Sequence, residues 1–356
     1  MLIFRLFLLL LLVFCCSSCS DFGYYLSAGL NQLNILNSRE DLDTILNRAK
    51  ASNDQELINK IKLIQAARSY ATKLGITVGG TFDSIAQLEN EKKIWVLMAT
   101  EPNSMRLHYW EYPIVGRAPY KGFFDQELSQ STQQEFDQKK YTTNIRETVA
   151  FSSLGWFDDP ILPSLLKLDR LVLTNTIFHE LIHKQIWIKN RVALNESLAS
   201  FLGYEINVSF YRSRLKTLID QQRESQLANY SSDLLAQARL DYQQALEQRA
   251  RLFANAKRMR VLYGRLTRLN REIRLDQAGR SERSHIFERL KLNSEANNAE
   301  IMQQKIYLTA ISNLADCSKK YPQLPKLFAF IERMFKVSPQ VSLSKLRRCS
   351  VGLDRK

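Results

Sequence analysis

The chain has 356 residues, of which 45% are hydrophobic and 24% charged, and its formal net charge at pH 7 is +14. Such a basic balance often indicates a nucleic-acid partner. Here the cations are spread along helical segments instead of forming one block, and the N-terminus predicts export, so we expect no nucleic-acid partner. Attraction to anionic lipid or envelope polymers, or a solvated surface without any partner, fits this distribution better.

Residues 1–18 predict a secretory signal peptide. One positive residue, Arg5, precedes an apolar stretch from Leu6 to Cys16 that is too short to span a bilayer stably as a helix. Two serines precede Cys19, as suits signal peptidase II, so we expect lipidation of Cys19. The chain is then a membrane-anchored lipoprotein of the bacterial cell envelope that faces the periplasm. Simple secretion and a retained anchor are the alternatives.

Removal of the leader leaves 356 − 18 = 338 residues, enough for one large or two small domains. Residues 19–92 predict an N-terminal helical segment, with one long stretch from Gly23 to about Leu74 and a short helix near Ser84–Lys92. The apolar run at 92–100 predicts a buried strand. Residues 107–157 carry the aromatic, β-branched and turn residues typical of further strands, so we expect the whole sheet here.

The rest of the chain predicts helices. Within a catalytic core at 93–212, helices are expected at Ile161–Ile188 and Ala193–Arg212, joined by a turn at Asn190-Arg191. Asp158-Asp159, before Pro160, suit a cap for the first of them. Residues 213–290 predict a long helical hairpin broken near Ala228–Ser232. Residues 291–356 form a C-terminal helical segment, with a helix at Asn297–Phe335, that completes the core. The expected fold is α+β and predominantly helical.

The helix at 161–188 carries the most informative motif, His179-Glu180-Leu181-Ile182-His183. Positions four apart on a helix turn through about 400°, so both imidazoles project from one face and share one metal ion. Catalytic zinc takes three protein ligands and keeps one open position, which makes Glu196 on the next helix the natural third ligand. Glu180, beside the metal, then serves as general base toward a metal-bound water.

The alternative for this motif is a pair of surface histidines on a helix. Surface residues would have polar neighbours, whereas Leu181 and Ile182 are apolar and the run from 171 to 183 has no charge except Glu180. A structural zinc site is disfavoured because such sites prefer cysteine ligands and have no open position. The sequence therefore predicts a catalytic Zn²⁺ bound by His179, His183 and Glu196.

Several segments together resemble a family of bacterial lipoproteins classed as predicted zinc aminopeptidases. The resemblance implies a gluzincin-type metallopeptidase with a zincin-like catalytic domain, a small β-sheet and a helical excursion, acting on peptide substrates. It also supports the metal ligands above and Glu180 as base. It spans nearly the whole mature chain, and its matching stretches are YYLSAGLNQLNIL, YPIVGRAPYKGFFD, FSSLGWFDDPIL, FHELIHKQIWIKN, LNESLASFLGYE and LNSEANNAE, together with Tyr307.

The chain departs from better-known gluzincins in two ways. The gap between His183 and Glu196 is thirteen residues, which is shorter, and Ser200 stands where an aspartate usually braces a ligand histidine. The brace must therefore come from another group. A strand of the kind that holds a free amino terminus in large aminopeptidases is not evident, which weakens the aminopeptidase prediction relative to an endopeptidase.

A donor for the oxyanion of the reaction is expected among three residues, Tyr307, Tyr263 and His285. We choose Tyr307 as the catalytic candidate because it matches the family pattern, with packing on a helix as its alternative. Phe151–Ser153 are candidates for an edge strand that pairs with an extended substrate.

Two cysteines besides Cys19 remain in the mature chain, Cys317 and Cys349, and these pair only if the fold brings them together. The sequence leaves the oligomeric state open. The principal alternative to an enzyme is a non-enzymatic envelope lipoprotein whose basic helical region at 213–290 binds a partner. The presence of Glu180 favours the enzyme.

Overall fold

The computed structural model describes residues 19–88, 93–101, 104–112, 116–136, 140–148, 158–224, 232–272, 285, 288 and 297–337. Over these residues the chain is predominantly helical with small antiparallel sheets, which confirms the expected α+β class. The signal peptide at 1–18 and the edge strand expected at 151–153 lie outside them. No helix among the described residues is long and apolar enough to cross a membrane.

The N-terminal segment differs from the single long helix that its periodicity predicts. A short strand, β1, interrupts the helices and pairs antiparallel with β2, so the short helix expected near 84–92 is wrong at its start. All three residues of β2 are buried, and Ile85 also bridges Ile161, so contacts distant in sequence decide its conformation. The elements are α2 (Cys19–Asn37), β1 (Arg39–Asp41), α3 (Leu42–Ala51), α4 (Gln55–Lys73) and β2 (Ser84–Ala86).

A three-stranded antiparallel sheet in the order β6-β3-β7 forms the β part of the core, with a two-stranded β4-β5 sheet beside it. The buried strand predicted at 92–100 is confirmed as β3. One part of the region expected to form only strands is instead the helix α5, capped by Asp125, whose side chain accepts from Leu128 N. The elements are β3 (Ile94–Thr100), β4 (Trp110–Tyr112), β5 (Gly116–Ala118), β6 (Lys121–Phe123), α5 (Gln126–Gln134) and β7 (Thr142–Thr148).

The alternation of β3 directs its side chains to two different layers. Leu97 packs with Tyr24 of α2 and with Leu128 of α5, on one face of the sheet. Met98, on the other face, packs with a cluster that includes Met302. The sheet therefore separates α2 and α5 from the helices that follow residue 160.

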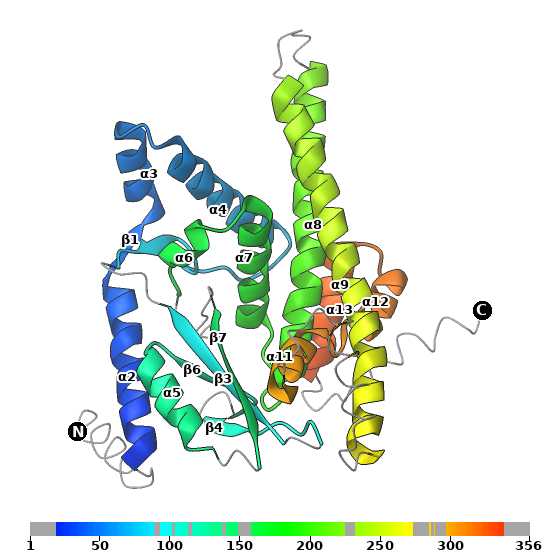
Figure 1. The fold of residues 1–356 in the computed structure, drawn as a ribbon. Helices are drawn as coiled ribbons and strands as arrows, with labels where there is room; N and C mark the ends of the chain where they lie inside the picture. Colours follow the sequence, from blue (N-terminus) through cyan, green and yellow to red (C-terminus); the bar gives the residue numbers. More distant parts are fainter. Residues whose placement is uncertain are drawn as a thin grey trace.

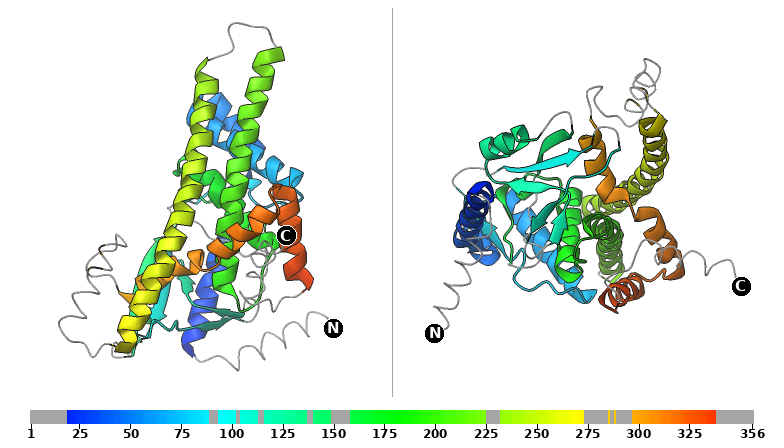
Figure 2. Two further views of the ribbon diagram at one scale, coloured as in Figure 1. Left: turned by 90° about the vertical axis from the view of Figure 1, so that its right-hand side faces the viewer. Right: turned by 90° about the horizontal axis from the view of Figure 1, so that it is seen from below.

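Those later helices are α6 (Pro163–Leu166), α7 (Arg170–Gln185), α8 (Val192–Glu224), α9 (Ser232–Glu272), α11 (Asn298–Leu308), α12 (Ile311–Lys320) and α13 (Leu324–Val337). The helix expected to end at Arg212 continues to Glu224, because no glycine or proline lies between these two residues. Helices α8 and α9 run side by side as a long hairpin that projects beyond the other elements, while α2 lies at the opposite edge (Figures 1 and 2).

The expected capping role of Asp158-Asp159 is wrong. The cap of α6 is Leu162, which makes no side-chain cap bond, and the cap of α7 is Asp169. Asp158 instead pairs with Lys184 Nζ at 2.6 Å. Asp159 is buried and accepts from Gln32 Nε2 at 3.5 Å. Both aspartates therefore tie together segments that are far apart in the sequence.

Cys317 is fully buried on α12 and is disulfide-bonded. Cys349, the partner that the sequence suggests, lies outside the described residues, so this pairing stays a prediction.

Candidate metal centre

Helix α7 carries both histidines, and its first residue is fixed by the N-cap Asp169. Asp169 accepts hydrogen bonds from the backbone N–H groups of Leu171 and Val172, which satisfies two otherwise unpaired donors of the first turn. Ten residues further on, His179 follows the fully buried Phe178, and His183 is itself only 3% exposed. The helix is therefore capped at the exposed Asp169 and buries the second histidine.

Helix α8 packs closely against α7 at the level of the motif. A Cβ built on Gly203 would lie 3.4 Å from the backbone N of His179, so a side chain larger than methyl would push the helices apart. Further along, Thr174 Oγ1 donates to Asn207 Oδ1 at 2.7 Å, and Asn207 Nδ2 donates to the carbonyl of Leu171 at 3.1 Å. Small residues and buried hydrogen bonds together hold the two helices in one register.

The turn between the helices is held by Asn195, which immediately precedes the predicted third ligand. Its side chain accepts from Ile188 N at 3.0 Å and donates to Ile188 O at 2.9 Å, and it is 1% exposed. A turn is predicted at Asn190-Arg191, and in the structure Asn190 adopts the left-handed conformation with φ 63°. This short closed turn brings Glu196 to the histidines despite a gap of only thirteen residues.

The structure brings the three predicted ligands together. His179 Nε2 and His183 Nε2 lie 3.1 Å apart, and Glu196 Oε2 lies 3.3 Å from the first and 3.4 Å from the second. Among the described residues this is the one group of three such side chains whose ligand atoms lie so close together. Ligands at the usual zinc bond lengths in a tetrahedron are about 3.3–3.5 Å apart. The donor set and its spacing therefore fit a metal ion.

Burial and charge keep Glu196 ionised. Burial by itself would raise the pKa of this carboxyl group, but the neighbouring imidazoles of His183 and His179 outweigh burial and hold the pKa far below its ordinary value. A deprotonated carboxylate is the form that binds a metal.

Tyr120 is a site residue that the sequence analysis did not identify. It lies just before β6, and its hydroxyl donates to Glu196 Oε1 at 3.1 Å, so Oε2 remains for the metal. Burial, followed by the charge of Glu196, raises the pKa of Tyr120, so the phenol keeps its proton. Tyr120 lies within YPIVGRAPYKGFFD, one of the stretches that carry the resemblance, and this was the signal that could have found it.

The hydrogen bond from Tyr120 to Glu196 holds one of the three candidate ligands in place. Ser200 stands where an aspartate would usually hold a ligand histidine. Within the described part of the chain, His183 Nδ1 is buried without a hydrogen-bond partner. The ligand held by a neighbouring side chain is therefore the carboxylate, through Tyr120, and not this histidine.

Tyr307, the predicted oxyanion donor, lies next to the ligands. It projects from α11, and its ring centroid is 6.3 Å from that of His179. Its hydroxyl oxygen accepts a hydrogen bond from Arg146 Nη2 at 3.1 Å, so its proton remains available for another acceptor. Burial, then the charge of Glu196, raises the pKa of Tyr307 well above its ordinary value.

Arg146 is the second residue that the sequence analysis missed. It lies on β7, where its cross-strand partner on β3 is Val96, and Asn144, two positions earlier, donates to Gln303 Oε1 at 2.8 Å. Two buried nitrogen atoms, Arg146 Nε and Gln303 Nε2, have no hydrogen-bond partner among the described residues. The alternation of β7 thus directs two polar side chains toward α11 beside the metal ligands.

Of the remaining predicted residues that the structure describes, only Glu180 interacts with a residue of the candidate centre. Glu180 is half-buried one position after His179, and its charge acts on Tyr307, which places it at the centre. Tyr263 is a residue of α9, and Lys305 Nζ lies 4.0 Å from its ring centroid. His285 is exposed and lies 3.7 Å from Glu288. Neither makes a recorded contact with the ligands, so Tyr307 is the better supported oxyanion donor of the three.

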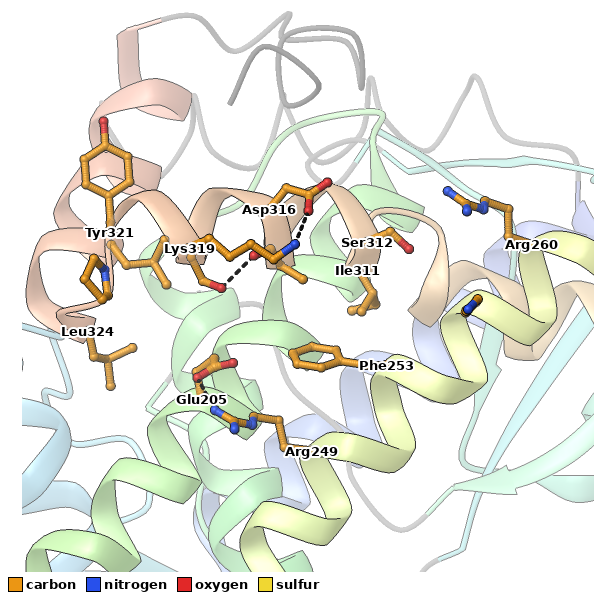
Figure 3. Close-up of a pocket in the computed structure, with 15 residues that line it drawn as sticks. Glu205, Arg249, Phe253, Arg260, Ile311, Ser312, Asp316, Lys319, Tyr321 and Leu324 are labelled. Atoms are coloured by element: carbon orange, nitrogen blue, oxygen red, sulfur yellow. Dashed lines mark hydrogen bonds and ion pairs between the residues drawn. The ribbon is translucent and has the colours of Figure 1, made fainter. Parts of the chain in front are cut away.

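A separate pocket of about 700 Å³ lies between α8, α9, α12 and α13 (Figure 3). Its two carboxylates are already paired, Glu205 with Arg249 at 3.2 Å and Asp316 with Lys319 at 3.0 Å. None of the metal ligands lines this pocket. We therefore assign it no part in the chemistry of the metal centre.

A family model described as "Putative aminopeptidase" matches residues 23–345, which is most of the chain. Neither the curated proteins nor the solved structures contain a match to this chain.

Proposed function

We propose that this chain, which belongs to the Aminopep family, is a zinc-dependent peptidase of the bacterial cell envelope, anchored by a lipid at Cys19. Membership of the family supports peptidase activity in general and a peptide as substrate. Zinc, the anchor and the preference for a free amino terminus are the finer parts of the proposal. The observation that carries it is the convergence of His179, His183 and Glu196 within 3.4 Å of one another.

The proposed mechanism assigns one role to each side chain. His179, His183 and Glu196 would hold zinc, which supplies Lewis acidity toward the carbonyl and toward water when it is bound. Glu180 takes the proton of the attacking water and later delivers it to the leaving amine. Since Glu180 is not one of the three converging ligands, the carboxylate that moves the proton need not also bind the metal.

Tyr307 stabilises the negative charge that develops on the carbonyl oxygen. A donor must keep its proton for this role, and both the burial of Tyr307 and its raised pKa favour the protonated phenol at neutral pH. Arg146 occupies one acceptor position of the phenol oxygen and so restricts the direction of the O–H bond. Preorganised donors of this kind typically contribute about 10²–10³-fold to the rate.

Strand β7 bears on the choice between exopeptidase and endopeptidase. Among the described strands β7 pairs only with β3, so its other edge is not paired by them, and β7 carries Arg146, which donates to Tyr307. An extended peptide adds to such an edge by backbone hydrogen bonds on both sides of the cleaved bond. This observation favours an endopeptidase as the second candidate, whereas the description of the family favours an aminopeptidase.

The test is a metal analysis combined with a cleavage profile. Purified protein is expected to contain close to one zinc per chain, and His183→Ala is expected to lose most of it. A mixed peptide library digested by the wild type should show products shortened from their amino termini. Internal cuts alone would replace the aminopeptidase with an endopeptidase, and full zinc occupancy in His183→Ala would overturn the metal assignment.

A further inference from the structure

Helix α2 exposes several of its large apolar side chains and buries a polar one. Leu26, Leu30 and Leu33 are 50%, 58% and 56% exposed, whereas Gln32 is only 9% exposed and hydrogen-bonds to the buried Asp159. The three leucines follow the spacing i, i+4 and i+7, so they form one stripe on the outer side of the helix. We call this stripe the leucine face of α2.

The leucine face is unusual for a surface in contact with water. Of the eight large apolar side chains that are exposed among the described residues, four lie on α2, the fourth being Tyr25. No charged residue occurs from Phe22 to Asn37. Isolated exposed leucines are ordinary, but a contiguous apolar stripe on an uncharged stretch of helix indicates an interaction surface.

The place of α2 in the chain indicates the partner. The helix begins at Cys19, the proposed site of the lipid, and follows the apolar residues 6–16 without a charged linker. We propose that the leucine face lies in the interfacial layer of the membrane to which the protein is attached. This inference rests on the anchoring part of the proposed function, and the positive charge of the chain favours an anionic lipid surface.

The packing of α2 gives this contact a consequence for the metal centre. On its inner side, the Tyr24 ring lies 5.3 Å from the ring of Phe123 on β6, so the helix is fixed to the sheet. Tyr24 packs with Leu97 on one face of β3, while α11, which carries Tyr307, packs with Met98 on the other face. A membrane against the leucine face therefore lies across the sheet from the metal centre, which then faces away from the lipid. Figures 1 and 2 show α2 at the edge of the molecule away from α8 and α9.

An environment-sensitive fluorophore on the variant Leu30→Cys tests the contact. The full chain is purified from membranes and reconstituted in vesicles of phosphatidylethanolamine and phosphatidylglycerol, and the wild-type chain gives the labelling background. The matched control is position 234 on α9, where another leucine is 56% exposed. Emission at position 30 should shift to shorter wavelength, and nitroxide-labelled lipid should quench it at least ~3-fold more than at position 234.

Two further variants make the outcome decisive. Leu26→Asn with Leu33→Asn should remove the shift at position 30, whereas Leu234→Asn with Leu240→Asn should leave it unchanged. Equal, water-like emission at positions 30 and 234 would overturn the proposal, as would protection of position 30 in a dimer without lipid. Fatty-acid labelling of Cys19 and peptide hydrolysis are measured on the same samples. Loss of the lipid at Cys19 or of peptidase activity is therefore measured separately from loss of the contact between the leucine face and the membrane.

Discussion

The two halves of α8 form one continuous helix in two different environments. From Val192 to Tyr211 nearly every residue is buried or half-buried, and this inner half carries Glu196. From Arg212 onward, the outer half is largely exposed and runs beside α9 (Figure 1). The inner half is buried among other elements, whereas the outer half buries less of its surface and depends more on helix propensity. We therefore expect substitutions in the inner half to affect the metal centre and stability, and substitutions in the outer half to be tolerated.

The largest effect is expected for Glu180→Gln, on the helix that faces the inner half. The change keeps size but removes the basic carboxylate, so hydrolysis should fall ~10²- to 10⁴-fold with zinc content unchanged. This corresponds to roughly 3–5 kcal/mol of transition-state stabilisation. Asp220→Asn, the same kind of change in the outer half, should retain wild-type turnover. Wild-type rates in Glu180→Gln would remove this residue from the mechanism, and loss of zinc would make it a ligand.

Stability should follow the same division. Phe201 is fully buried in the inner half, and Phe201→Ala should lower the free energy of unfolding by about 3–5 kcal/mol through lost burial and a cavity. Leu215→Ala in the outer half, where the side chain is half-exposed, should cost less than about 1 kcal/mol. Denaturant unfolding of both variants measures the difference. Equal losses would mean that the two halves are equally well packed.

A moderate effect on metal affinity is expected when the hydrogen bond from Tyr120 to Glu196 is removed. Tyr120→Phe keeps the ring but loses the hydrogen bond to Glu196, and outer contacts of this kind typically change metal affinity ~10- to 100-fold. Competition with a chelator should show weaker zinc binding at an unchanged fold by circular dichroism. The matched control is Tyr242→Phe on α9, which should bind zinc as the wild type does. Unchanged affinity in Tyr120→Phe would mean that the bond does not hold the ligand.

The smallest effect concerns ion pairs at the surface. The hydrogen bond from Lys184 lowers the pKa of Asp158, so this carboxylate stabilises the fold above its unfolded pKa near 4 and loses that contribution as pH falls through the lower folded pKa. Because Asp158 is 47% exposed, Asp158→Asn should cost only about 0.2–1 kcal/mol at pH 7, and this cost should disappear as pH falls through the lowered folded pKa. Glu247→Gln, which breaks the exposed pair with Arg251, should cost less still.

The local features of the metal centre were predictable from the sequence. Two histidines four positions apart on a helix must share a face, and the apolar residues around Glu180 indicate that the motif lies on a largely buried helix. The third ligand followed from the coordination that catalytic zinc requires. The structure brings the three side chains together, whereas zinc and the role of Glu180 stay predictions. The shared face of the two histidines was predictable because it depends only on helical geometry over a few residues.

Features that depend on distant segments were missed. The β1–β2 pair joins residues 39–41 to residues 84–86, and no local pattern distinguishes those short strands from helix. Tyr120 and Arg146 reach the centre only because β6 and β7 flank β3 in one sheet. The cap at Asp169 was missed because the Asp158-Asp159 pair, which the tertiary structure uses elsewhere, gave a similar signal.

The sequence by itself determined the class of the fold, the buried strand at 92–100 and the candidate ligand set of the metal centre, since helix and strand periodicity and ligand chemistry are local properties. Only the tertiary structure decided which side chains surround that ligand set, how far α8 extends and which face of α2 is left apolar and exposed. These depend on how separate elements pack, and packing is decided by the whole chain at once.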